Sequence, residues 1–553
     1  MNVQYFPPRT LGPGENWQLP PLRLLVYTGS WQRVARDCST WFAATFRPRS
    51  TPPWTQEVEA YTPEWVPDPE NAHPTSQPIA PSVKGFSNFA QLSRLYLGDQ
   101  YMLKEWAMYN SKVLVGVPPG DLGYCRQADG TYCVRYDLGG AAAAKQGVAA
   151  AHRIGRRAIF YVEGLVVRKC SDLTLGGVAA DMALMNKDGK HWEHYPDHWH
   201  MCPGSIQWQD HMAQTCKRLL WETGADGIRL DSLGYYFVPC YNPAHHHENP
   251  FGWNQWIREY FRKIRAAMDE VNPQAILLTE CPVDFYNEST NGALALSGPL
   301  CDIAPLRLVA PDYRMYGYSA GLMESVLNGW VFGWGALKSA NGQPFPDDAK
   351  PRWPELRATF AETLLQGDPC DQNSVAPDDP RWIGRLWRGP RYWMLVGGRM
   401  DLASLNGPTR VNLPKLPDGV RQAWEFDPVT LNVRDAGLHR TEQGAWVTVT
   451  HSSSAVLLPL PDCPPLLGLD RLPANLRMGQ EVRLHVTAWA PWRAQPQAPV
   501  SVMADLPGLA EPRQINIPGE VIFTIPAKVE PGHYYLHLHG DGLPLKRWLK
   551  VNE

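Results

Sequence analysis

The sequence predicts an α/β protein, a (β/α)8 TIM barrel followed by two small all-β domains of the sandwich type. Apolar strand-like runs alternate with helical segments from about residue 90 onward, which is typical of a parallel sheet covered by helices on both faces. These units lack a glycine-rich nucleotide-binding motif, which favours a closed barrel over a doubly wound sheet. The helical pattern ends near residue 380, where short β runs separated by turn residues begin.

Residues 1–85 are rich in proline and are predicted to form an N-terminal extension. Within this extension, 22–29 has the pattern of a strand and 31–46 that of a helix. Because a single strand needs partners, the run at 22–29 is interpreted either as the remnant of an N-terminal β domain or as a strand that pairs elsewhere.

Residues 86–380 are predicted to form the barrel. Ser205 is the expected N-cap, and Gly224 the expected stop, of the helix between the third and fourth strands. The last two βα units are not assigned. The expected strands are 93–99, 112–120, 156–164, 226–231 and 275–280, with 301–309 as a candidate sixth, and the expected helices are 100–110, 139–155, 206–224 and 254–271.

The remainder of the chain is predicted to form a β-sandwich domain at 381–462 and a C-terminal, immunoglobulin-like all-β domain at 463–553. The proline-rich stretch 462–473 is expected to link the two domains.

The composition and the first residues of the chain limit which binding partners and which cellular compartment are expected. A formal net charge of -3 argues against nucleic acid or an anionic membrane as a partner, and no apolar run is long enough to span a bilayer. The first residues lack the apolar core of a signal peptide, and the eleven cysteines have no CxxC pair or zinc spacing. These features predict a cytoplasmic protein, with an exported mature form as the alternative. The oligomeric state is not predicted.

Two carboxylates end two consecutive strands of the predicted barrel, Asp231 in GADGIRLD and Glu280 in AILLTE. Catalytic groups of barrel enzymes lie at the carboxyl ends of the strands, and neighbouring strands lie roughly 4.8 Å apart. The two carboxyl groups are therefore expected to approach to about 5 to 5.5 Å, the separation used by retaining glycosidases. One acid then attacks the anomeric carbon, while the other protonates the leaving oxygen and later activates water.

The neighbours of the two acids suggest how these roles are divided. Arg229 lies two residues before Asp231, so both side chains emerge on one face of the strand. A guanidinium there favours the ionised carboxylate and fixes its orientation, which predicts Asp231 as the nucleophile. The apolar residues before Glu280 predict a partly desolvated carboxyl, the setting of a general acid. The alternative for each acid is structural, as a helix cap or a surface ion-pair partner.

These segments resemble conserved motifs of the α-amylase-type, clan H-like glycoside hydrolases, and in particular their divergent, poorly characterised relatives. Gly227, Arg229 and Asp231 match the Gly-x-Arg-x-Asp of the family's fourth strand, and Glu280 matches the glutamate that ends its fifth strand. The resemblance covers roughly residues 90–380. It implies that the aspartate is the nucleophile, the glutamate the acid/base and the arginine the nucleophile's partner, and that the bond cleaved is an α-glycoside.

Three features of the family are missing from this sequence. Tyr235 stands where the family has a histidine four residues after the nucleophile, and the third strand ends in YVEG instead of Asp-x-x-x-Asn-His. The strand-seven His-Asp pair, which carries a third carboxylate, is not visible. A close relative of amylase is therefore not expected. The candidates for a third acid are Asp302, Asp312 and Asp368, with structural roles as the alternative.

Several side chains near the predicted site are expected to contact the substrate by stacking or hydrogen bonding, with core packing as the alternative for the tyrosines. The 23 tryptophans, against 15 phenylalanines, fit a sugar ligand, because indole faces suit sugar rings. The candidates are Glu163, Tyr195, Trp199, His200, Arg229, Tyr235 and Tyr236.

Two histidine-rich stretches, 191–201 and 244–249, lie in loops after the third and fourth strands. Neither contains HExxH or another recognised metal spacing. Both are interpreted as loops near the active-site mouth, and no metal or other cofactor is expected.

The predicted function is that of a glycosidase that hydrolyses O-glycosyl bonds of an oligo- or polysaccharide with retention of configuration. Two alternatives stay open. One is a transglycosylase, in which a sugar replaces water as the acceptor, and the other is a catalytically inactive, carbohydrate-binding barrel.

Overall fold

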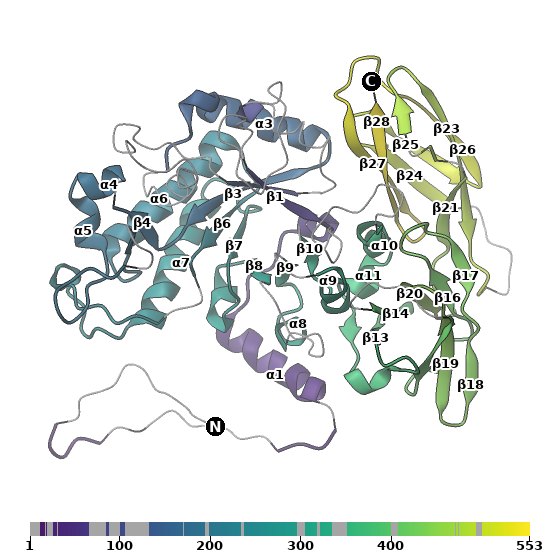
Figure 1. Cartoon of the computed structure of the whole chain (residues 1–553), viewed down its shortest axis with the longest axis horizontal. Coiled ribbons are helices and arrows are strands. Elements are labelled where there is room, and N and C mark those ends of the chain that lie inside the picture. Colours follow the sequence, from purple (N-terminus) through teal and green to yellow (C-terminus); the bar gives the residue numbers. More distant parts are fainter. Residues whose placement is uncertain are drawn as a thin grey trace.

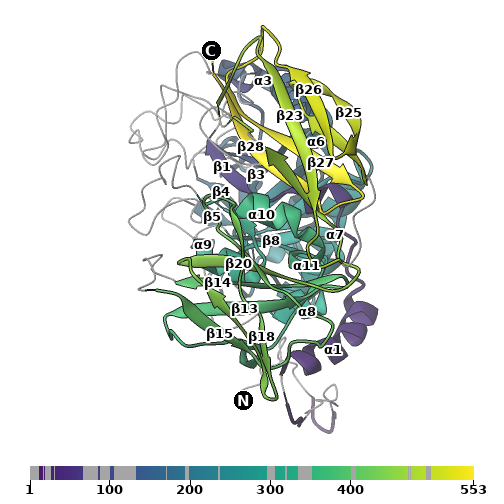
Figure 2. The ribbon, with the colours of Figure 1, turned by 90° about the vertical axis from the view of Figure 1, so that its right-hand side faces the viewer.

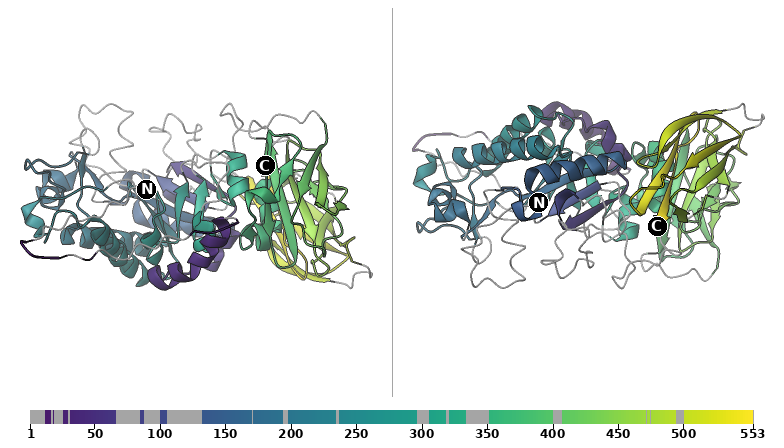
Figure 3. Two further views of the ribbon diagram at one scale, coloured as in Figure 1. Left: turned by 90° about the horizontal axis from the view of Figure 1, so that it is seen from below. Right: turned by 90° about the horizontal axis from the view of Figure 1, so that it is seen from above.

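A computed structural model of the chain describes residues 12–16, 18, 26–29, 31–65, 85–87, 100–104, 132–169, 171–193, 198–233, 237–295, 305–317, 321–333, 351–399, 407–470, 472–473, 475–493 and 500–552. Helices surround a parallel sheet in the first part of the chain, and the β-rich part lies at the other end of the long axis (Figure 1, Figure 3). Within the described residues, no helix is long and apolar enough to cross a membrane.

The first part is built on one eight-stranded sheet, in the order β1-β2-β3-β6-β7-β8-β9-β10, with every neighbouring pair parallel. Its strands are β1 Tyr61–Trp65, β2 Gln100–Lys104, β3 Arg157–Glu163, β6 Gly227–Asp231, β7 Ile276–Thr279, β8 Gly292–Ala295, β9 Arg314–Gly317 and β10 Val331–Phe332. The antiparallel pair β4 Val166–Arg168 and β5 His198–His200 lies in the loop after β3.

The helices of this part are α1 Trp31–Phe46, α3 Gly140–Arg153, α4 Asp172–Leu175, α5 Val178–Met182, α6 Ile206–Thr223, α7 Trp253–Asp269, α8 Pro305–Val309, α9 Leu322–Asn328, α10 Trp353–Thr359 and α11 Ala361–Leu364. Short 3-10 helices lie at Pro53–Glu57, Tyr136–Leu138, Pro243–His245, Asp284–Glu288 and Gln372–Ser374.

The sheet curls until its two edges meet at a single parallel bridge between Ala60 and Phe332. The amide of Phe332 donates to the carbonyl of Glu59 (2.9 Å), and the buried guanidinium of Arg357 binds the side chain and carbonyl of Glu59 and the carbonyl of Trp330. The barrel is therefore closed at one point rather than along a full ladder. The parallel strand order matches the predicted fold class.

Side chains alternate across the barrel wall, as the period of a β-strand requires. In β3, Ile159 and Tyr161 pack in an inner cluster with Ile276 and Leu278. The intervening Phe160 packs in the layer between sheet and helices.

Helix α6 follows the capping signals of its sequence. The side chain of Ser205 accepts a hydrogen bond from the amide of Trp208, and Gly224 ends the helix with a φ of 68°. The expected helix at 31–46 coincides with α1, which packs against α8.

Several sequence expectations differ from the structure. Residues 100–104, expected to begin a helix, form β2, because β1 and β3 flank them as partners on both sides. The sixth strand is β8 at 292–295; the candidate at 301–309 was wrong, since 305–309 are helical, with proline at the first turn. Residues 26–29 of the expected strand at 22–29 are not a strand, and 93–99 and 112–120 lie outside the described residues.

The first barrel strand, β1, lies within the predicted N-terminal extension, 1–85. The division at residue 86 therefore separates a strand from its own sheet. The other domain limits stay predictions.

The β-rich part faces the viewer in Figure 2. It contains two pairs of sheets, each pair with a hydrophobic core between its two sheets. The first pair has the orders β11-β13-β14-β20-β16-β17 and β12-β15-β19-β18. Its strands are β11 Asp368–Pro369, β12 Ala376–Pro377, β13 Trp382–Arg388, β14 Tyr392–Arg399, β15 Thr409–Leu413, β16 Trp424–Phe426, β17 Val433–Asp435, β18 His439–Thr441, β19 Gly444–Val449 and β20 Ser453–Pro459.

The second pair has the orders β21-β23-β26 and β22-β28-β27-β24-β25. Part of the expected linker, 462–473, is strand β21, which pairs with β23 and so belongs to the last domain. The strands are β21 Leu466–Asp470, β22 Asn475–Arg477, β23 Glu481–Trp489, β24 Val500–Leu506, β25 Ala510–Ile517, β26 Gly519–Thr524, β27 Gly532–Gly540 and β28 Leu545–Asn552.

This last domain contacts the barrel at the amino ends of the strands. The guanidinium of Arg156, just before β3, donates to the carbonyl of His533 (2.8 Å). The ring of Tyr535 lies directly against Gly155, where a Cβ atom would meet the phenol oxygen. The carboxyl ends of the strands therefore face away from this contact.

Candidate active site

Asp231 and Glu280 lie side by side at the carboxyl ends of β6 and β7. Leu230 of β6 is in register with Thr279 of β7, and the two acids are the next residue on each strand. The amide of Ser232 donates to Oε2 of Glu280 (3.0 Å), which links the second acid to the residue after the first. Both carboxylates are partly exposed.

Arg229 is the ion-pair partner of Asp231, with its guanidinium bound to Oδ1. The arginine side chain is 2% exposed and that of the aspartate 17%. The guanidinium also lies over the ring of Tyr161, 4.7 Å from the ring centre. The arginine thus fixes the orientation of Asp231 from the interior of the barrel.

A third carboxyl group, Glu163, lies next to Asp231 on the neighbouring strand. Glu163 ends β3 in register with Asp231 on β6, and its side chain is buried. Its Oε2 accepts a hydrogen bond from the hydroxyl of Ser232 (2.7 Å), and its Oε1 lies 2.6 Å from the hydroxyl of Tyr161. The same tyrosine hydroxyl contacts Oδ2 of Asp231.

A count of protons indicates that either Glu163 or Asp231 is neutral, and the ion pair of Asp231 with Arg229 favours a neutral Glu163. The hydroxyl of Tyr161 has one proton, so it can donate to only one of the two carboxyl groups it touches. If it donates to Asp231, the short contact with Glu163 requires a proton on Glu163. Burial, followed by the charge of Asp231, raises the pKa of Glu163 to about 8. The same two causes raise the pKa of Tyr161 well above its ordinary value.

Ser232 joins all three acids, because it follows Asp231 in the chain, donates its amide to Glu280 and donates its hydroxyl to Glu163. Its φ is 59°, a left-handed conformation that is uncommon outside glycine and is typical of functional sites. At the adjacent strand end, the amide of Gly164 donates to the carbonyl of Asp231 (3.1 Å). A Cβ at Gly164 would meet that carbonyl at 2.8 Å.

Sequence reasoning missed Tyr161 and Ser232. Tyr161 lies two residues before Glu163, so the period of a strand places both side chains on one face. The same rule identified Arg229 from Asp231, and applying it to Glu163 would have found the tyrosine. The positive φ of Ser232 has no comparable signal in the sequence.

Two of the other predicted substrate-binding residues, Trp199 and His200, lie in β5, in the long loop after β3. Trp199 lines an open groove of about 700 Å³ and its ring lies 4.6 Å from that of His191. His200 is fully buried, and its Nδ1 lies 3.0 Å from the carbonyl of Met201. Tyr195, Tyr235 and Tyr236 lie outside the described residues.

Neither described candidate for the third acid joins the site. Asp312 precedes β9, at the opposite end of the sheet from Asp231. Asp368 lies in β11 and binds Arg388 (2.6 Å). Asp302 lies outside the described residues.

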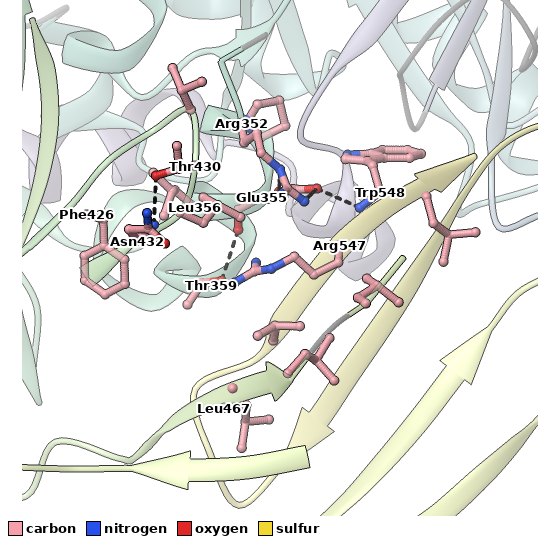
Figure 4. Close-up of a pocket in the computed structure, with 18 of the residues that line it drawn as sticks. Arg352, Glu355, Leu356, Thr359, Phe426, Thr430, Asn432, Leu467, Arg547 and Trp548 are labelled. Atoms are coloured by element: carbon pink, nitrogen blue, oxygen red, sulfur yellow. Dashed lines mark hydrogen bonds and ion pairs between the residues drawn. The ribbon is translucent and has the colours of Figure 1, made fainter. Parts of the chain in front are cut away.

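A cavity of about 920 Å³ lies between α10 and the two β-rich domains (Figure 4). Glu355 accepts hydrogen bonds there from Arg352 (2.8 Å) and from the amide of Trp548 (2.6 Å). Burial lowers the pKa of the nearby Arg547 to about 10. Asp231 and Glu280 do not line this cavity, which we interpret as a junction between domains.

Comparisons with known proteins agree with this architecture. A family model described as a domain of unknown function, DUF6259, matches residues 138–298. That range contains Glu163, Asp231 and Glu280. No curated protein matches the sequence.

Two solved structures have similar folds. One is a noncanonic maltogenic α-amylase from Thermotoga neapolitana, with 12% identity, 74% of this chain and 100% of that chain covered, and a TM-score of 0.52. The other is a cycloisomaltooligosaccharide glucanotransferase from Paenibacillus sp., complexed with cycloisomaltoheptaose, with 10% identity, coverage of 73% and 85%, and a TM-score of 0.50. At this identity the likeness concerns the fold, a parallel barrel accompanied by β-rich domains.

Proposed function

We propose that this protein is a glycoside hydrolase that cleaves α-glycosidic bonds of an oligo- or polysaccharide with retention of configuration. The observation that carries the proposal is the pair of partly exposed carboxylates, Asp231 and Glu280, at the carboxyl ends of adjacent barrel strands. A retaining glycosidase uses such a pair, one carboxylate as the nucleophile and the other as the acid/base. The fold is compatible with this activity, and the α preference rests on the resemblance of the strand-end motifs alone.

Asp231 is assigned as the nucleophile because a hydrogen-bond partner holds each of its two carboxylate oxygens and so fixes its orientation. Arg229 holds Oδ1 and Tyr161 holds Oδ2. Attack on the anomeric carbon forms a glycosyl ester with Asp231 and breaks the bond to the leaving oxygen.

Glu280 is assigned as the acid/base. In the first step its carboxyl proton passes to the leaving oxygen. In the second step its carboxylate takes a proton from water, whose oxygen displaces Asp231 from the sugar. The amide of Ser232 fixes one oxygen of Glu280 (3.0 Å) next to the nucleophile.

Glu163 and Tyr161 act as positioning residues in this scheme. A neutral Glu163 adds no second negative charge next to Asp231. The positive charge of Arg229 therefore acts on Asp231 and is not divided with a carboxylate on β3. The fixed hydroxyl of Tyr161 limits the rotation of the nucleophile.

The test is hydrolysis of a panel of α- and β-linked glycosides by the unaltered protein and by Asp231→Asn and Glu280→Gln. Asp312→Asn, which removes an exposed carboxylate at the opposite end of the sheet, is the matched control. We expect both strand-end variants to lose activity by several orders of magnitude, the control to keep it, and the product to have the configuration of the substrate by proton NMR.

Other outcomes separate the alternatives. Full activity in Asp231→Asn would refute the assignment of the nucleophile. Products longer than the substrate, formed when an acceptor sugar is added, would identify a transglycosylase. Saturable oligosaccharide binding without turnover would identify a binding protein.

A further inference from the structure

Four potential metal ligands meet outside the site just described. The side chains of Cys202, Cys240, His245 and His247 place one ligand atom each within 4.8 Å of all the others. The two cysteines are buried and the two histidines are half-buried. Cys202 follows β5 in the loop after β3, whereas the other three belong to the loop after β6.

We propose that these four side chains bind one zinc ion in a tetrahedral, structural site. Two thiolates and two imidazoles are the donor set that zinc takes in closed structural sites. Four protein ligands leave no open position for water or substrate, so this ion holds the fold and does not take part in hydrolysis. The site is independent of the proposed glycosidase chemistry.

All four ligand atoms lie within 4.8 Å of one another, and two of the distances between them are close to those in a tetrahedral site. Zinc–sulfur bonds of about 2.3 Å and zinc–nitrogen bonds of about 2.0 Å place neighbouring ligand atoms about 3.3 to 3.8 Å apart. Sγ of Cys202 lies 3.3 Å from Nε2 of His247, and Sγ of Cys240 lies 3.2 Å from Nδ1 of His245. Both pairs need to move by only a few tenths of an ångström to accept the ion.

The ring of His245 is oriented by a second partner, as is usual for a metal-bound histidine. Its Nε2 lies 2.7 Å from the carbonyl of Asp181 in α5. That partner requires a proton on Nε2, which leaves Nδ1, the atom that faces Cys240, free of a proton and able to bind a cation.

The ring of His247 is held by packing. It stacks on the indole of Trp256 in α7, with ring centres 3.9 Å apart and planes at 20°. Gly204 and Gly252 allow this arrangement, because a Cβ at either position would lie within 2.7 Å of Trp256. The ring is therefore fixed with its Nε2 toward Cys202.

The backbone that carries these ligands is also fixed. Asn242 caps the short 3-10 helix at 243–245 by accepting from the amide of Ala244 (3.0 Å), and its Nδ2 donates to the carbonyl of Ala183 (2.9 Å). The amide of Cys240 donates to the carbonyl of Pro250 (2.9 Å). The bond from Asn242 to Ala183 joins the two loops close to the proposed ion, and the other two bonds fix the loop after β6.

This site was not predicted from the sequence. Its only local signal is Cys-x4-His-x-His at 240–247, and the remaining ligand, Cys202, is far away in the chain. The stretch 244–249 was interpreted as a solvated loop without a metal. The proposal replaces that interpretation, because the fold brings Cys202, which follows β5, to the loop after β6.

The first test uses the unaltered protein, purified without added metal or chelator. We expect about one zinc ion per chain by mass spectrometry of the metals. After removal of zinc with a chelator and addition of Co²⁺, we expect the visible absorption of tetrahedral cobalt together with a near-ultraviolet thiolate-to-cobalt band.

The variants locate the ion. Cys240→Ser and His247→Asn should each reduce the zinc content by at least about tenfold. With cobalt, Cys240→Ser should weaken the thiolate–cobalt band, since Cys202 still supplies one thiolate, and His247→Asn should remove the tetrahedral spectrum. His246→Asn is the matched control, because His246 is exposed in the same loop and its φ of 51° suits asparagine. Cys216→Ser is a second control, because it removes a buried thiol outside the cluster.

Three results would overturn the proposal. The first is an unaltered protein that contains no zinc and gives no tetrahedral cobalt spectrum. The second is a Cys202–Cys240 disulfide found by peptide mapping of the freshly purified, metal-free protein. The third is equal loss of zinc in His246→Asn and in His247→Asn. The first two need no substitution, so a variant that fails to fold does not affect them.

Discussion

Replacement of Glu163 by glutamine should remove a pH dependence of stability that this carboxyl group imposes on the barrel. Burial raises the pKa of Glu163 from 4.5 to about 8, so the folded protein keeps a proton that the unfolded chain loses above pH 4.5. The stabilisation from this proton is complete below pH 4.5 and is lost as the pH rises toward 8.

The size of the effect follows from that shift. Each pH unit between the two values lowers the free energy of unfolding by about 1.4 kcal/mol, which gives at most about 5 kcal/mol in total. Glutamine resembles the neutral acid in shape and does not titrate. Its amide can donate to the hydroxyl of Tyr161 or of Ser232, because each hydroxyl is also an acceptor.

The assay is urea-induced unfolding of both proteins between pH 5 and pH 9, followed by tryptophan fluorescence. We expect Glu163→Gln to be about as stable as the unaltered protein at pH 5 and more stable by several kcal/mol at pH 9. Glu511→Gln, an exposed position on β25, should follow the unaltered protein at every pH. Parallel stability curves for Glu163→Gln and the unaltered protein would refute the assignment of a neutral Glu163.

Three further predictions concern catalysis, barrel closure and helix capping. Tyr161→Phe removes a hydrogen bond to the charged Asp231, worth about 1.5 to 3 kcal/mol. It should lower kcat by about 10- to 100-fold with little change in KM. A change in KM alone would contradict a positioning role. Arg357→Met removes the guanidinium from Glu59, a carboxylate that is 1% exposed, and should lower the free energy of unfolding in denaturant by about 3 to 5 kcal/mol. Adding Glu59→Gln should recover part of this loss. No recovery would mean that the unpaired charge of Glu59 is not the cause. Ser205→Ala removes the cap of α6 and should cost about 1 kcal/mol, whereas an unchanged unfolding midpoint would show that the cap is not needed.

Local patterns were sufficient for much of the barrel. Ser205 and Gly224 mark the ends of α6 in the sequence, because an N-cap side chain and a left-handed C-cap act within a few residues of the helix end. The strands of Asp231 and Glu280 were found in the same way, as apolar runs that end on a carboxylate.

Local patterns were insufficient where partners decide the structure. The run at 100–104 has apolar residues at spacings that suit either a helix or a strand, and pairing with β1 and β3 decides the outcome. Closure of the sheet depends on Ala60 and Phe332, whose meeting follows from the curvature of the whole sheet.

The same division applies to the sites. The positions of Asp231 and Glu280 at strand ends, and of Arg229 two residues before Asp231, follow from the sequence alone, because strand period and motif spacing are properties of a few adjacent residues. The burial of Glu163 next to Asp231, and the contact of Cys202 with side chains of a distant loop, depend on the tertiary structure. Burial and contact between distant segments depend on how the chain closes on itself, and no short stretch of sequence contains that information.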